Sequence, residues 1–519
     1  MERLSSFLRL VWTGTGDRLD QQTYIYSYRL SNKDGQVSLR TIHSGVVGMS
    51  NRTWETRSKF LRLAFQNYYQ SNHAEVDQPD KIHTREFAFE DWEYSWRCPK
   101  GTDEDDSGNK FEYGCDSSGI AFNRLHSCPF CGSTEIKVTN WVRHIGFRTQ
   151  KALLKELVEV APHSVYHSAA FYNIPVARDK GWQGAELIFD IDADHLNSPC
   201  ANEHDSWRCN NASCLETGKG ASPSNCPKCG GKNIVARKWL CDRCLEDAKR
   251  DTIRVYDEFL TEDFAIDPDN IQLNFSGHRG YHIRVRDPRV FHLDSDGRTE
   301  IAHYISGMGF RLAPAKGAST SDKHRVIVVS KKAPLPTKSN PRFNVPGWGN
   351  RVAQAMISFI QNIESYDGKE RWKERLEKHR EEAIKGLKRT PPILSPRVKG
   401  VGDKFWQEIA VKAVEAFGGE IDLPVTHDIG RVIRLIGSLN GKTGFSVKIL
   451  TRDAIAEFDP FSDALAITNG KLKVRFDSVL DIPKIRIGDN TYGPFHKESV
   501  DLPMEVAIFM LCKGVATIE

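Results

Sequence analysis

The spacing of the cysteines constrains the fold of this chain more than any other feature of the sequence. Eleven of the twelve cysteines fall into two groups, from Cys98 to Cys131 and from Cys200 to Cys244. Each group contains a Cys-Pro-x-Cys pair followed by glycine, a pattern typical of zinc ribbons. The spacing predicts three sites of four ligands each: Cys98, Cys115, Cys128 and Cys131; Cys209, Cys214, Cys226 and Cys229; and Cys200, His204, Cys241 and Cys244.

Closed four-ligand zinc sites are structural, so we expect them to hold inserted segments together. Contact of a ribbon with nucleic acid or with a partner protein is the alternative role. In the first site, His126 is an alternative ligand to Cys115. Cys512 has no partner in this scheme, and its apolar surroundings predict a buried free thiol.

Length and charge exclude several classes of protein. The chain has 519 residues, of which 39% are hydrophobic, and this predicts a globular protein of about two to four domains. A formal net charge of +4 excludes a uniformly basic nucleic-acid binder but allows a local basic groove. No apolar run reaches the roughly 20 residues of a membrane helix, and Arg9 interrupts the apolar start. We therefore expect no membrane association and a cytosolic location, where clustered cysteines are metal ligands more often than disulfides.

Alternating carboxylates end the segment Glu186–His195, which has the pattern of a β-strand. Side chains two residues apart share one face of a strand, so Asp190 and Asp192 would converge. Two such carboxylates repel each other and suit Mg²⁺ or Mn²⁺, the ions of two-metal phosphoryl or nucleotidyl transfer. Asp194 is a weaker third ligand than a carboxylate from a distant segment. The alternative is an acidic pair that ends a strand in solvent and binds no ion.

A basic turn with two glycines joins the strand patterns Ile271–Phe275 and Tyr281–Val285, which together predict a hairpin. The turn and the strand after it can bind a triphosphate through backbone N–H groups and through Ser276, Arg279 and His282. An ordinary hairpin turn with exposed basic residues is the alternative. The carboxylate pair upstream favours the phosphate-binding interpretation.

Helical patterns occupy residues 58–69, 352–363 and 370–388, and a further helix from Asp403 ends at Gly418-Gly419. Prolines between residues 334 and 346 indicate a linker, and Pro391-Pro392 would end the charged helix. Basic residues between 385 and 404 could follow a phosphate backbone, although mixed charge on the helix before them favours a solvated face. The segment Gly437–Thr443 has three residues, not four, between its first glycine and Gly-Lys-Thr, so it is not a P-loop.

Taken together, these motifs resemble the small catalytic subunit of archaeal DNA primase, in the archaeo-eukaryotic primase superfamily. The resemblance covers about residues 56–519 and rests on residues 184–195, 275–282 and 424–444, with weaker matches at 85–89 and 143–147. It implies three catalytic carboxylates that bind Mg²⁺ or Mn²⁺: Asp190, Asp192 and Asp422. It implies nucleotide binding by Ser276, Arg279, His282 and Arg434. The site of Cys200, His204, Cys241 and Cys244 resembles the family's own zinc site, and the two ribbons resemble additions.

Two positions depart from the family pattern. His278 stands where many relatives have a second arginine, and Asn440 stands where a histidine is usual. Both changes would reduce the positive charge that faces the phosphates of an incoming nucleotide. They bear on affinity or nucleotide choice, while the three carboxylates of the family are all present.

The resemblance implies an α/β (α+β) fold: a primase catalytic core at 56–345, a helical subdomain at 346–420 and a return to the core at 421–519. The first ribbon would be inserted at about 97–132 and the other zinc modules at about 200–245, and residues 1–55 form an extension without an assigned role. The implied function is template-directed synthesis of primers from NTP or dNTP on single-stranded DNA. An iron-sulfur-containing large subunit would be the partner, and the location would be cytoplasmic, at the nucleoid. The alternatives are a primase-polymerase of DNA repair or damage tolerance, and a non-catalytic zinc-ribbon subunit that binds nucleic acid.

Overall fold

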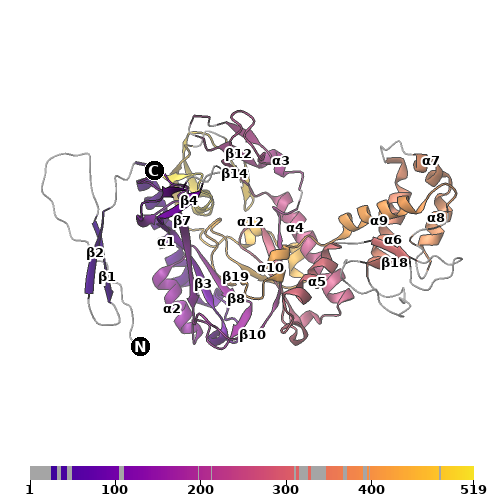
Figure 1. Cartoon of the computed structure of the whole chain (residues 1–519), viewed down its shortest axis with the longest axis horizontal. Coiled ribbons are helices and arrows are strands. Elements are labelled where there is room, and N and C mark those ends of the chain that lie inside the picture. Colours follow the sequence, from indigo (N-terminus) through magenta and orange to yellow (C-terminus); the bar gives the residue numbers. More distant parts are fainter. Residues whose placement is uncertain are drawn as a thin grey trace.

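A computed structural model describes residues 25–31, 37–43, 49–104, 110–196, 198–211, 213–214, 216–308, 311–314, 325–328, 347–365, 371–389, 394, 396, 398–477 and 481–519. The fold mixes helices and strands throughout this part of the chain (Figure 1). The predicted linker prolines between 334 and 346, and Pro391-Pro392, lie outside the described residues. None of the helices among the described residues is long and apolar enough to cross a membrane.

Two sheets form the centre of the molecule. One has five strands: β3 (Phe87–Arg97), β6 (Ser118–Ala121), β7 (Lys137–Ile145), β8 (Ser164–Ser168) and β19 (Val432–Arg434). The other has the order β11-β16-β15-β20, with bounds Leu187–Asp192, Gly280–Val285, Ile271–Phe275 and Lys448–Leu450. In the second sheet β15 and β16 are antiparallel neighbours, which confirms the predicted hairpin.

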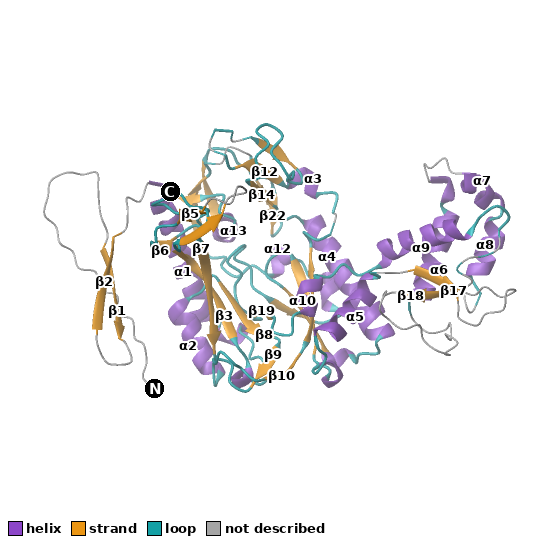
Figure 2. Cartoon of the chain, in the orientation of Figure 1, coloured by secondary structure: helices purple, strands orange, loops and turns teal. Residues whose placement is uncertain are grey.

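Helices pack on both sides of this centre (Figure 2). On one side, α1 (Met49–Ser71) packs on α2 (Gln150–Val160), on β3 and on α13 (Met504–Cys512). On the other side, α4 (Asp242–Arg254) packs on β11 and β16 and continues as a π-helical segment, Val255–Asp263. There, α5 (Ser295–Ser306) packs on α10 (Leu423–His427). The predicted helix at 58–69 is thus the second half of a longer helix.

Local sequence fixes the ends of these helices. The Thr149 side chain accepts a hydrogen bond from the Ala152 N–H at the start of α2, and Asp294 accepts one from Gly297 at the start of α5. α5 ends at Gly307, which has φ +65°. Such a left-handed residue ends a helix at little cost only when it lacks a Cβ.

A buried ion cluster joins the two sheets. Glu186, at the start of β11, pairs with Arg85 and with Arg284 of β16, each at 2.7 Å. Arg85 also donates to the carbonyl oxygens of Ser168 and Ala169. Although burial opposes ionisation, the two guanidinium groups lower the pKa of Glu186 to about 2. The side chains of this cluster are therefore ionised and paired with one another, and they fix the chain at the start of β11.

A helical region lies between β18 (Arg325–Val328) and α10 along the chain. It contains α6 (Trp348–Gln361), α7 (Arg371–Lys378), α8 (Arg380–Leu387) and α9 (Asp403–Phe417). The single charged helix expected over 370–388 is therefore wrong, because the chain breaks at His379. Leu376 of α7 and Leu387 of α8 are both buried in the main apolar core. The helix predicted from Asp403 is α9.

The remaining strands form small sheets. The pairs are β1 (Ile25–Ser31) with β2 (Val37–His43), β4 (Gly101–Glu104) with β5 (Lys110–Tyr113), β9 (Ala170–Tyr172) with β10 (Trp182–Ala185), β17 (Arg311–Pro314) with β18 (Arg325–Val328), and β22 (Ile485–Ile487) with β23 (Asn490–Tyr492). Two three-stranded sheets comprise β12 (Ser206–Cys209), β13 (Thr217–Lys219) and β14 (Ile234–Arg237), and β21 (Lys471–Arg475), β24 (Ser499–Pro503) and β25 (Thr517–Ile518). Three short helices complete the set: α3 (Ala201–His204), α11 (Ala454–Glu457) and α12 (Pro460–Asp463).

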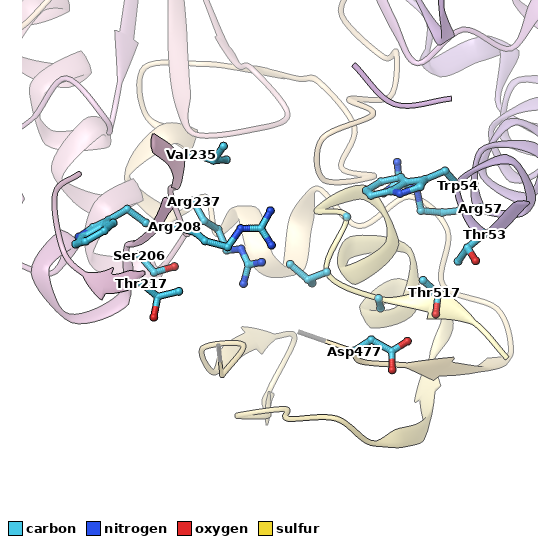
Figure 3. A pocket seen from close by; sticks show the side chains of 14 residues that line it. Thr53, Trp54, Arg57, Ser206, Arg208, Thr217, Val235, Arg237, Asp477 and Thr517 are labelled. Atoms are coloured by element: carbon cyan, nitrogen blue, oxygen red, sulfur yellow. The ribbon is translucent and has the colours of Figure 1, made fainter. Parts of the chain in front are cut away.

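Four segments that are far apart in the sequence meet around one cavity (Figure 3). These segments are the first turns of α1, the sheet of β12, β13 and β14, the chain just after β21, and the chain after α13. We call this space the C-terminal cavity and define it by its lining residues: Thr53, Trp54, Arg57, Ser206, Trp207, Arg208, Thr217, Val235, Arg237, Asp477, Gly514, Val515, Ala516 and Thr517.

Candidate functional site

Three carboxylates lie at the ends of elements that meet between the two sheets. β11 pairs with β16 so that Asp190 is opposite His282 and Asp192 is opposite Gly280. Asp422 immediately precedes α10, and its backbone N–H donates to the Asp190 carbonyl oxygen at 2.9 Å. The structure thus brings Asp422 next to Asp190, although 232 residues separate them in the sequence.

An apolar cluster places α10 against both sheets. Its members come from the chain after β8, from β11, from α10 and from β19: Ala169, Ile188, Val425 and Ile433. All four side chains are buried. Because this cluster packs α10 on β11, the position of Asp422 depends on hydrophobic contacts and not on attraction between the carboxylates, which repel each other.

The fold holds the two strand carboxylates in a state that disfavours negative charge. Burial, followed by the nearby Asp422, raises the pKa of Asp190 to about 6. Burial, followed by Asp190 and Asp194, raises the pKa of Asp192 to about 7. Asp190 Oδ1 has no hydrogen-bond partner, and His282 Nε2 lies 3.5 Å from it. Carboxylate oxygens that are crowded and lack a donor fit a hard divalent cation such as Mg²⁺ or Mn²⁺.

Asp194 does not share this environment. Its Oδ2 atom accepts hydrogen bonds from Arg279 at 2.6 Å and from Lys238 at 3.2 Å. Burial opposes ionisation here too, but Arg279 and Lys238 outweigh it and lower the pKa of Asp194. This carboxylate is therefore neutralised by protein cations.

The turn between β15 and β16 approaches the carboxylates closely. A Cβ atom at Gly280 would lie 2.1 Å from the Ile191 carbonyl oxygen and 2.4 Å from Asp192 Oδ1. Only glycine is compatible with this approach. Ser276 Oγ accepts hydrogen bonds from the N–H groups of His278 and Gly280, so it also shapes the turn itself.

A second loop supports the turn from behind. Asn440 is fully buried and donates to the Ser276 carbonyl oxygen at 3.1 Å, and Thr443 donates to the Gly277 carbonyl oxygen. Asn440 therefore supports the turn through a hydrogen bond. The resemblance had led us to expect that this position affects phosphate binding. No helix follows this loop before β20, in agreement with the rejection of a P-loop at Gly437–Thr443.

A buried arginine lies near His282, whose pKa is lowered by burial and further by the charge of this arginine. Arg434, on β19, is 8% exposed, and its guanidinium lies 4.3 Å from the centre of the Tyr166 ring. Its Nη1 atom has no hydrogen-bond partner. A buried guanidinium with an unused donor is suited to a phosphate oxygen. His282 supplies no charge at neutral pH, because burial lowers its pKa to about 4.

Lys513 is a site residue that the sequence analysis missed. Its Nζ atom lies 3.5 Å from His278 Nε2 at the turn. Burial, then Arg279 and Lys442, lower the pKa of Lys513 to about 7. The only sequence signal is a single lysine that ends the apolar helix α13 before Gly514. The arrangement as a whole provides carboxylates for a cation beside cations for a polyanion, as phosphoryl-transfer chemistry requires.

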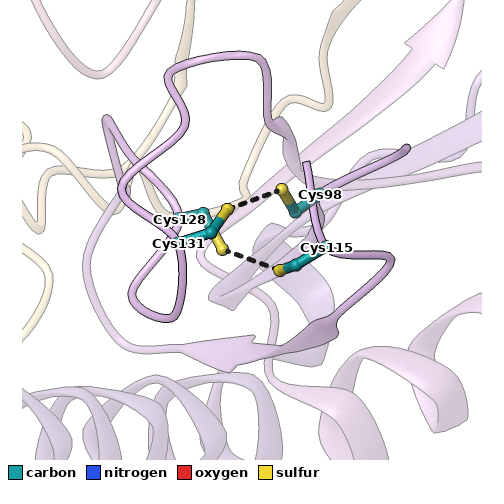
Figure 4. Close-up of side chains that lie close together, drawn as sticks. All are labelled: Cys98, Cys115, Cys128 and Cys131. Atoms are coloured by element: carbon teal, nitrogen blue, oxygen red, sulfur yellow. Dashed lines mark hydrogen bonds between the residues drawn. The ribbon is translucent and has the colours of Figure 1, made fainter. Parts of the chain in front are cut away.

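The cysteines form the three groups that their spacing predicts. In each group, the four candidate ligand atoms lie within 4.8 Å of one another, so each group could hold a metal ion. Figure 4 shows the first group, with Cys98 facing Cys131 at 3.7 Å and Cys115 facing Cys128 at 3.5 Å. Cys115, and not His126, is the member that joins this group.

The two Cys-Pro-x-Cys pairs have the same backbone conformation. Gly132 has φ +73° and Gly230 has φ +70°, and each donates its N–H to the carbonyl oxygen of the first cysteine of its pair, at 2.9 Å and 2.8 Å. The glycine after each pair is therefore required by the turn that brings the two thiols together. Cys512 belongs to none of the groups, and burial raises its pKa to about 12.

The mixed group uses a histidine that a carboxylate orients. His204 Nε2 lies 3.2 Å from Cys244 Sγ, and its other nitrogen, Nδ1, lies 2.8 Å from Asp205 Oδ1. This second contact fixes the ring so that Nε2 points at the thiols, which is the usual arrangement around a histidine ligand. Asp205 also accepts the Trp239 N–H at 2.9 Å, so the group is tied to the chain before α4.

Comparison with known proteins identifies similar sequences. The sequence model of a family described as "DNA primase small subunit" matches residues 233–452, a range that includes the turn, Asp422 and Arg434. The chain is 31% identical over 398 residues to the DNA primase small subunit of Methanothrix thermoacetophila, which covers 72% of this chain and 89% of the relative. It is 27% identical over 466 residues to that of Nitrosopumilus maritimus, with 89% and 99% coverage, and 29% identical over 504 residues to that of Methanosarcina barkeri, with 90% and 97% coverage.

Proposed function

Because the chain belongs to the family of DNA primase small subunits, we propose that it is a nucleotidyltransferase that starts short primers on single-stranded DNA without an existing primer end. The observation that carries this proposal is the state of Asp190 and Asp192. Their raised pKa values and the unpartnered Asp190 Oδ1 atom support a site where a divalent cation would replace missing interactions. The cations that face this place suit the phosphates of a nucleotide.

In this proposal, Asp190, Asp192 and Asp422 hold Mg²⁺ or Mn²⁺. When bound, these ions lower the pKa of the attacking 3′-hydroxyl and neutralise charge at the reacting phosphate. The chain's own contribution is to fix the three carboxylates before substrate arrives. The backbone hydrogen bond from Asp422 to Asp190 and the packing of α10 on β11 do this without help from the ion.

The same proposal assigns the phosphates of the incoming nucleotide to the basic side of the site. Arg434 offers its free Nη1 donor, and neutral His282 offers a directed hydrogen bond. Arg279 forms an ion pair with Asp194. In this proposal its guanidinium binds a phosphate either beside that carboxylate or in place of it. Ser276 keeps its hydroxyl proton for donation, because its oxygen accepts from the turn. Lys513 adds charge behind the turn, close to His278.

We propose structural Zn²⁺ for the three cysteine groups and a large subunit as the partner of this chain. The relatives are named as small subunits, and such a name implies a second subunit. After the three groups are assigned, Cys512 is the single cysteine that remains, so an iron-sulfur cluster would have its ligands in that partner. A primase acts on the chromosome, which places the proposed activity at the nucleoid.

The test is incorporation of labelled nucleotides by the purified chain on unprimed single-stranded DNA. Separate ribonucleotide and deoxyribonucleotide pools are supplied with Mg²⁺ or Mn²⁺. Asp190→Ala should abolish the product, whereas Asp489→Ala, a matched change at an exposed carboxylate in the turn between β22 and β23, should leave it unchanged. Extension of a supplied primer without synthesis on unprimed DNA would instead support a repair primase-polymerase. Absence of metal-dependent incorporation in both assays would support a non-catalytic nucleic-acid-binding subunit.

A further inference from the structure

The C-terminal cavity is a second place where positive charge is concentrated. Its volume is about 370 Å³, within the range of cavities that bind small ligands or parts of larger ones. None of its lining residues belongs to the carboxylate site. Its walls include three arginines, two tryptophans and a single carboxylate: Arg57, Arg208, Arg237, Trp54, Trp207 and Asp477.

Among the side chains that line this cavity, cationic groups outnumber carboxylates. Its carboxylate, Asp477, is already bound by Arg475 Nε at 2.8 Å, outside the lining set. Arg57 Nε has no hydrogen-bond partner, and burial lowers the pKa of Arg57 to about 10. Burial and the neighbouring Arg208 also lower the pKa of Arg237. Cations that are crowded in this way are stabilised by an anion between them.

The arginines face one space from opposite walls. In Figure 3, the guanidinium groups of Arg208 and Arg237 extend from the β12 and β14 side toward Trp54 and Arg57. Arg208 of β12 pairs with Val235 of β14, two residues before Arg237, so the two arginines lie diagonally on the same face of these antiparallel strands. A planar guanidinium binds a phosphate group through two parallel hydrogen bonds, so two of them side by side form a phosphate site.

The opposite wall offers a planar surface. Arg57 lies 3.9 Å from the centre of the Trp54 ring, so the indole and the guanidinium are stacked. The backbone passes close beneath them: a Cβ atom at Gly514, which has φ +67°, would lie 2.9 Å from Arg57 Nη1 and 3.4 Å from Trp54 Cη2. Aromatic rings next to arginines are the usual platform for nucleic-acid bases in proteins that bind single strands.

The cavity is continuous with the carboxylate site along the chain. Its floor, Gly514–Thr517, directly follows Lys513, whose Nζ atom lies 3.5 Å from His278 at the turn. Consecutive Cα atoms are about 3.8 Å apart, so the cavity begins within one residue of the basic side of the carboxylate site.

We propose that the C-terminal cavity binds a nucleoside phosphate of a single nucleic-acid strand, with the phosphate between Arg208 and Arg237 and the base against Trp54. That this nucleotide belongs to a nucleic-acid strand rests on the proposed function. The chemistry of the ligand, a phosphate next to a planar base, rests on the cavity alone. A free nucleotide has the same chemistry, and the experiment separates the two sources.

The experiment measures binding of a fluorescent oligothymidylate of about 20 nucleotides to the full chain by anisotropy over a range of salt concentrations. Arg208→Ala should weaken binding about five- to tenfold and reduce the slope of log K against log salt by about 1. Arg208 is exposed, so its removal leaves the fold intact. The matched control is Arg243→Ala, an exposed arginine of α4 that pairs with Glu203, and it should change binding less than about twofold.

A second variant tests the base platform. Trp54→Leu should weaken binding about tenfold without changing the salt slope, because it removes stacking and no charge. The same variants are titrated with ATP alone. Loss of oligothymidylate binding with unchanged ATP binding identifies a strand as the ligand, and loss of ATP binding identifies a free nucleotide.

The inference is overturned if Arg208→Ala and Trp54→Leu bind both probes as the unchanged protein does, with the same salt slope. Failure of the proposed function gives a different result. Asp190→Ala should bind oligothymidylate normally and incorporate no nucleotide. If the unchanged protein incorporates no nucleotide but Arg208→Ala still weakens strand binding, the cavity is a nucleic-acid site on a protein without primase activity.

Discussion

The carboxylates of β11 and the cysteines of the first ribbon are both sets of candidate metal ligands, but they depend on the fold in opposite ways. Asp190 and Asp192 end a strand within a core that extends through both central sheets. Around the ribbon, the separate buried cluster consists of Trp96, Cys98, Ala121 and Cys128, so half of its members are themselves ligands.

This difference identifies which site can exist without its ion. Hydrophobic packing builds the carboxylate site and holds charges that repel each other, so the fold forms without a cation there, and a bound cation would relieve the repulsion. In the first ribbon, few apolar side chains are buried besides the thiols, so a bound ion would take the place of a core. Removal of ligands should therefore affect function in the first case and stability in the second.

The largest expected effect is on catalysis. Asp192→Asn should reduce nucleotide incorporation by at least about 10³-fold, or about 4 kcal/mol of transition-state stabilisation. It should not reduce stability. The folded-state pKa of about 7 lies above that of an unfolded carboxyl group, so the folded protein loses stability as pH rises from about 4 to 7.

Asparagine does not ionise, so at pH 8 without added Mg²⁺ this variant should be more stable than the unchanged protein by about 1–3 kcal/mol. Urea unfolding at pH 5 and at pH 8 measures this difference, which should shrink at the lower pH. A variant that loses both activity and stability would contradict the distinction between the two kinds of site.

The second effect concerns the mixed group of α3 and α4. Cys244 is 5% exposed and belongs to the main core, so Cys244→Ser should lower the free energy of unfolding by about 3 kcal/mol and release zinc. Cys512→Ser is the matched control, because Cys512 lies outside the three groups, and it should cost about 1 kcal/mol with no loss of zinc. Equal effects of the two changes would show that the group binds no metal.

A tenfold effect is expected at Lys513. Lys513→Met should raise the KM for nucleotides about five- to tenfold by removing a charge near the turn. Its folded-state pKa of about 7 lies below the ordinary value, so the charged lysine costs stability, and this cost is full below pH 7 and disappears as pH rises toward 10.

Lys513→Met should therefore stabilise the protein at pH 6 by about 1–2 kcal/mol and have little effect on stability at pH 10. Thermal unfolding at the two pH values, together with steady-state kinetics, checks both parts. An unchanged KM would remove Lys513 from the phosphate-binding side of the site.

The smallest effect on global stability is expected in the first ribbon. Cys131→Ser should change the free energy of unfolding of the central sheets by less than about 1 kcal/mol, because Cys131 is exposed and its cluster is separate from the main core. Limited proteolysis should nevertheless cut the variant between residues 98 and 136 much faster than the unchanged protein. Resistance to the protease would mean that contacts other than a metal ion hold the ribbon.

Much of this arrangement could be predicted from local sequence. The β15–β16 hairpin follows from two apolar strand patterns around a glycine turn, and the membership of the cysteine groups follows from spacing. The same reasoning failed for the helix over 370–388, because no proline or glycine stands at His379 to signal the break between the two helices.

The contacts that complete the site could not be predicted from local patterns, because they join distant segments. The sequence favours a distant carboxylate over Asp194 as the third ligand. Nothing in it reveals that Lys238 and Arg279 neutralise Asp194. Lys513 has no motif, and its role follows from the packing of α13 beside the turn. The role of Asn440 similarly depends on one hydrogen bond, to the carbonyl oxygen of a turn residue 164 positions away in the sequence.

The most direct test of the account is the number of Mn²⁺ ions bound per chain, measured by electron paramagnetic resonance in the presence of a nucleotide. We predict about two ions for the unchanged protein, in keeping with a two-metal site. Joint Asp190→Asn and Asp192→Asn substitution should abolish this binding, while Asp489→Asn should retain it. Undiminished Mn²⁺ binding in the double variant would contradict the assignment of the end of β11 as the catalytic centre.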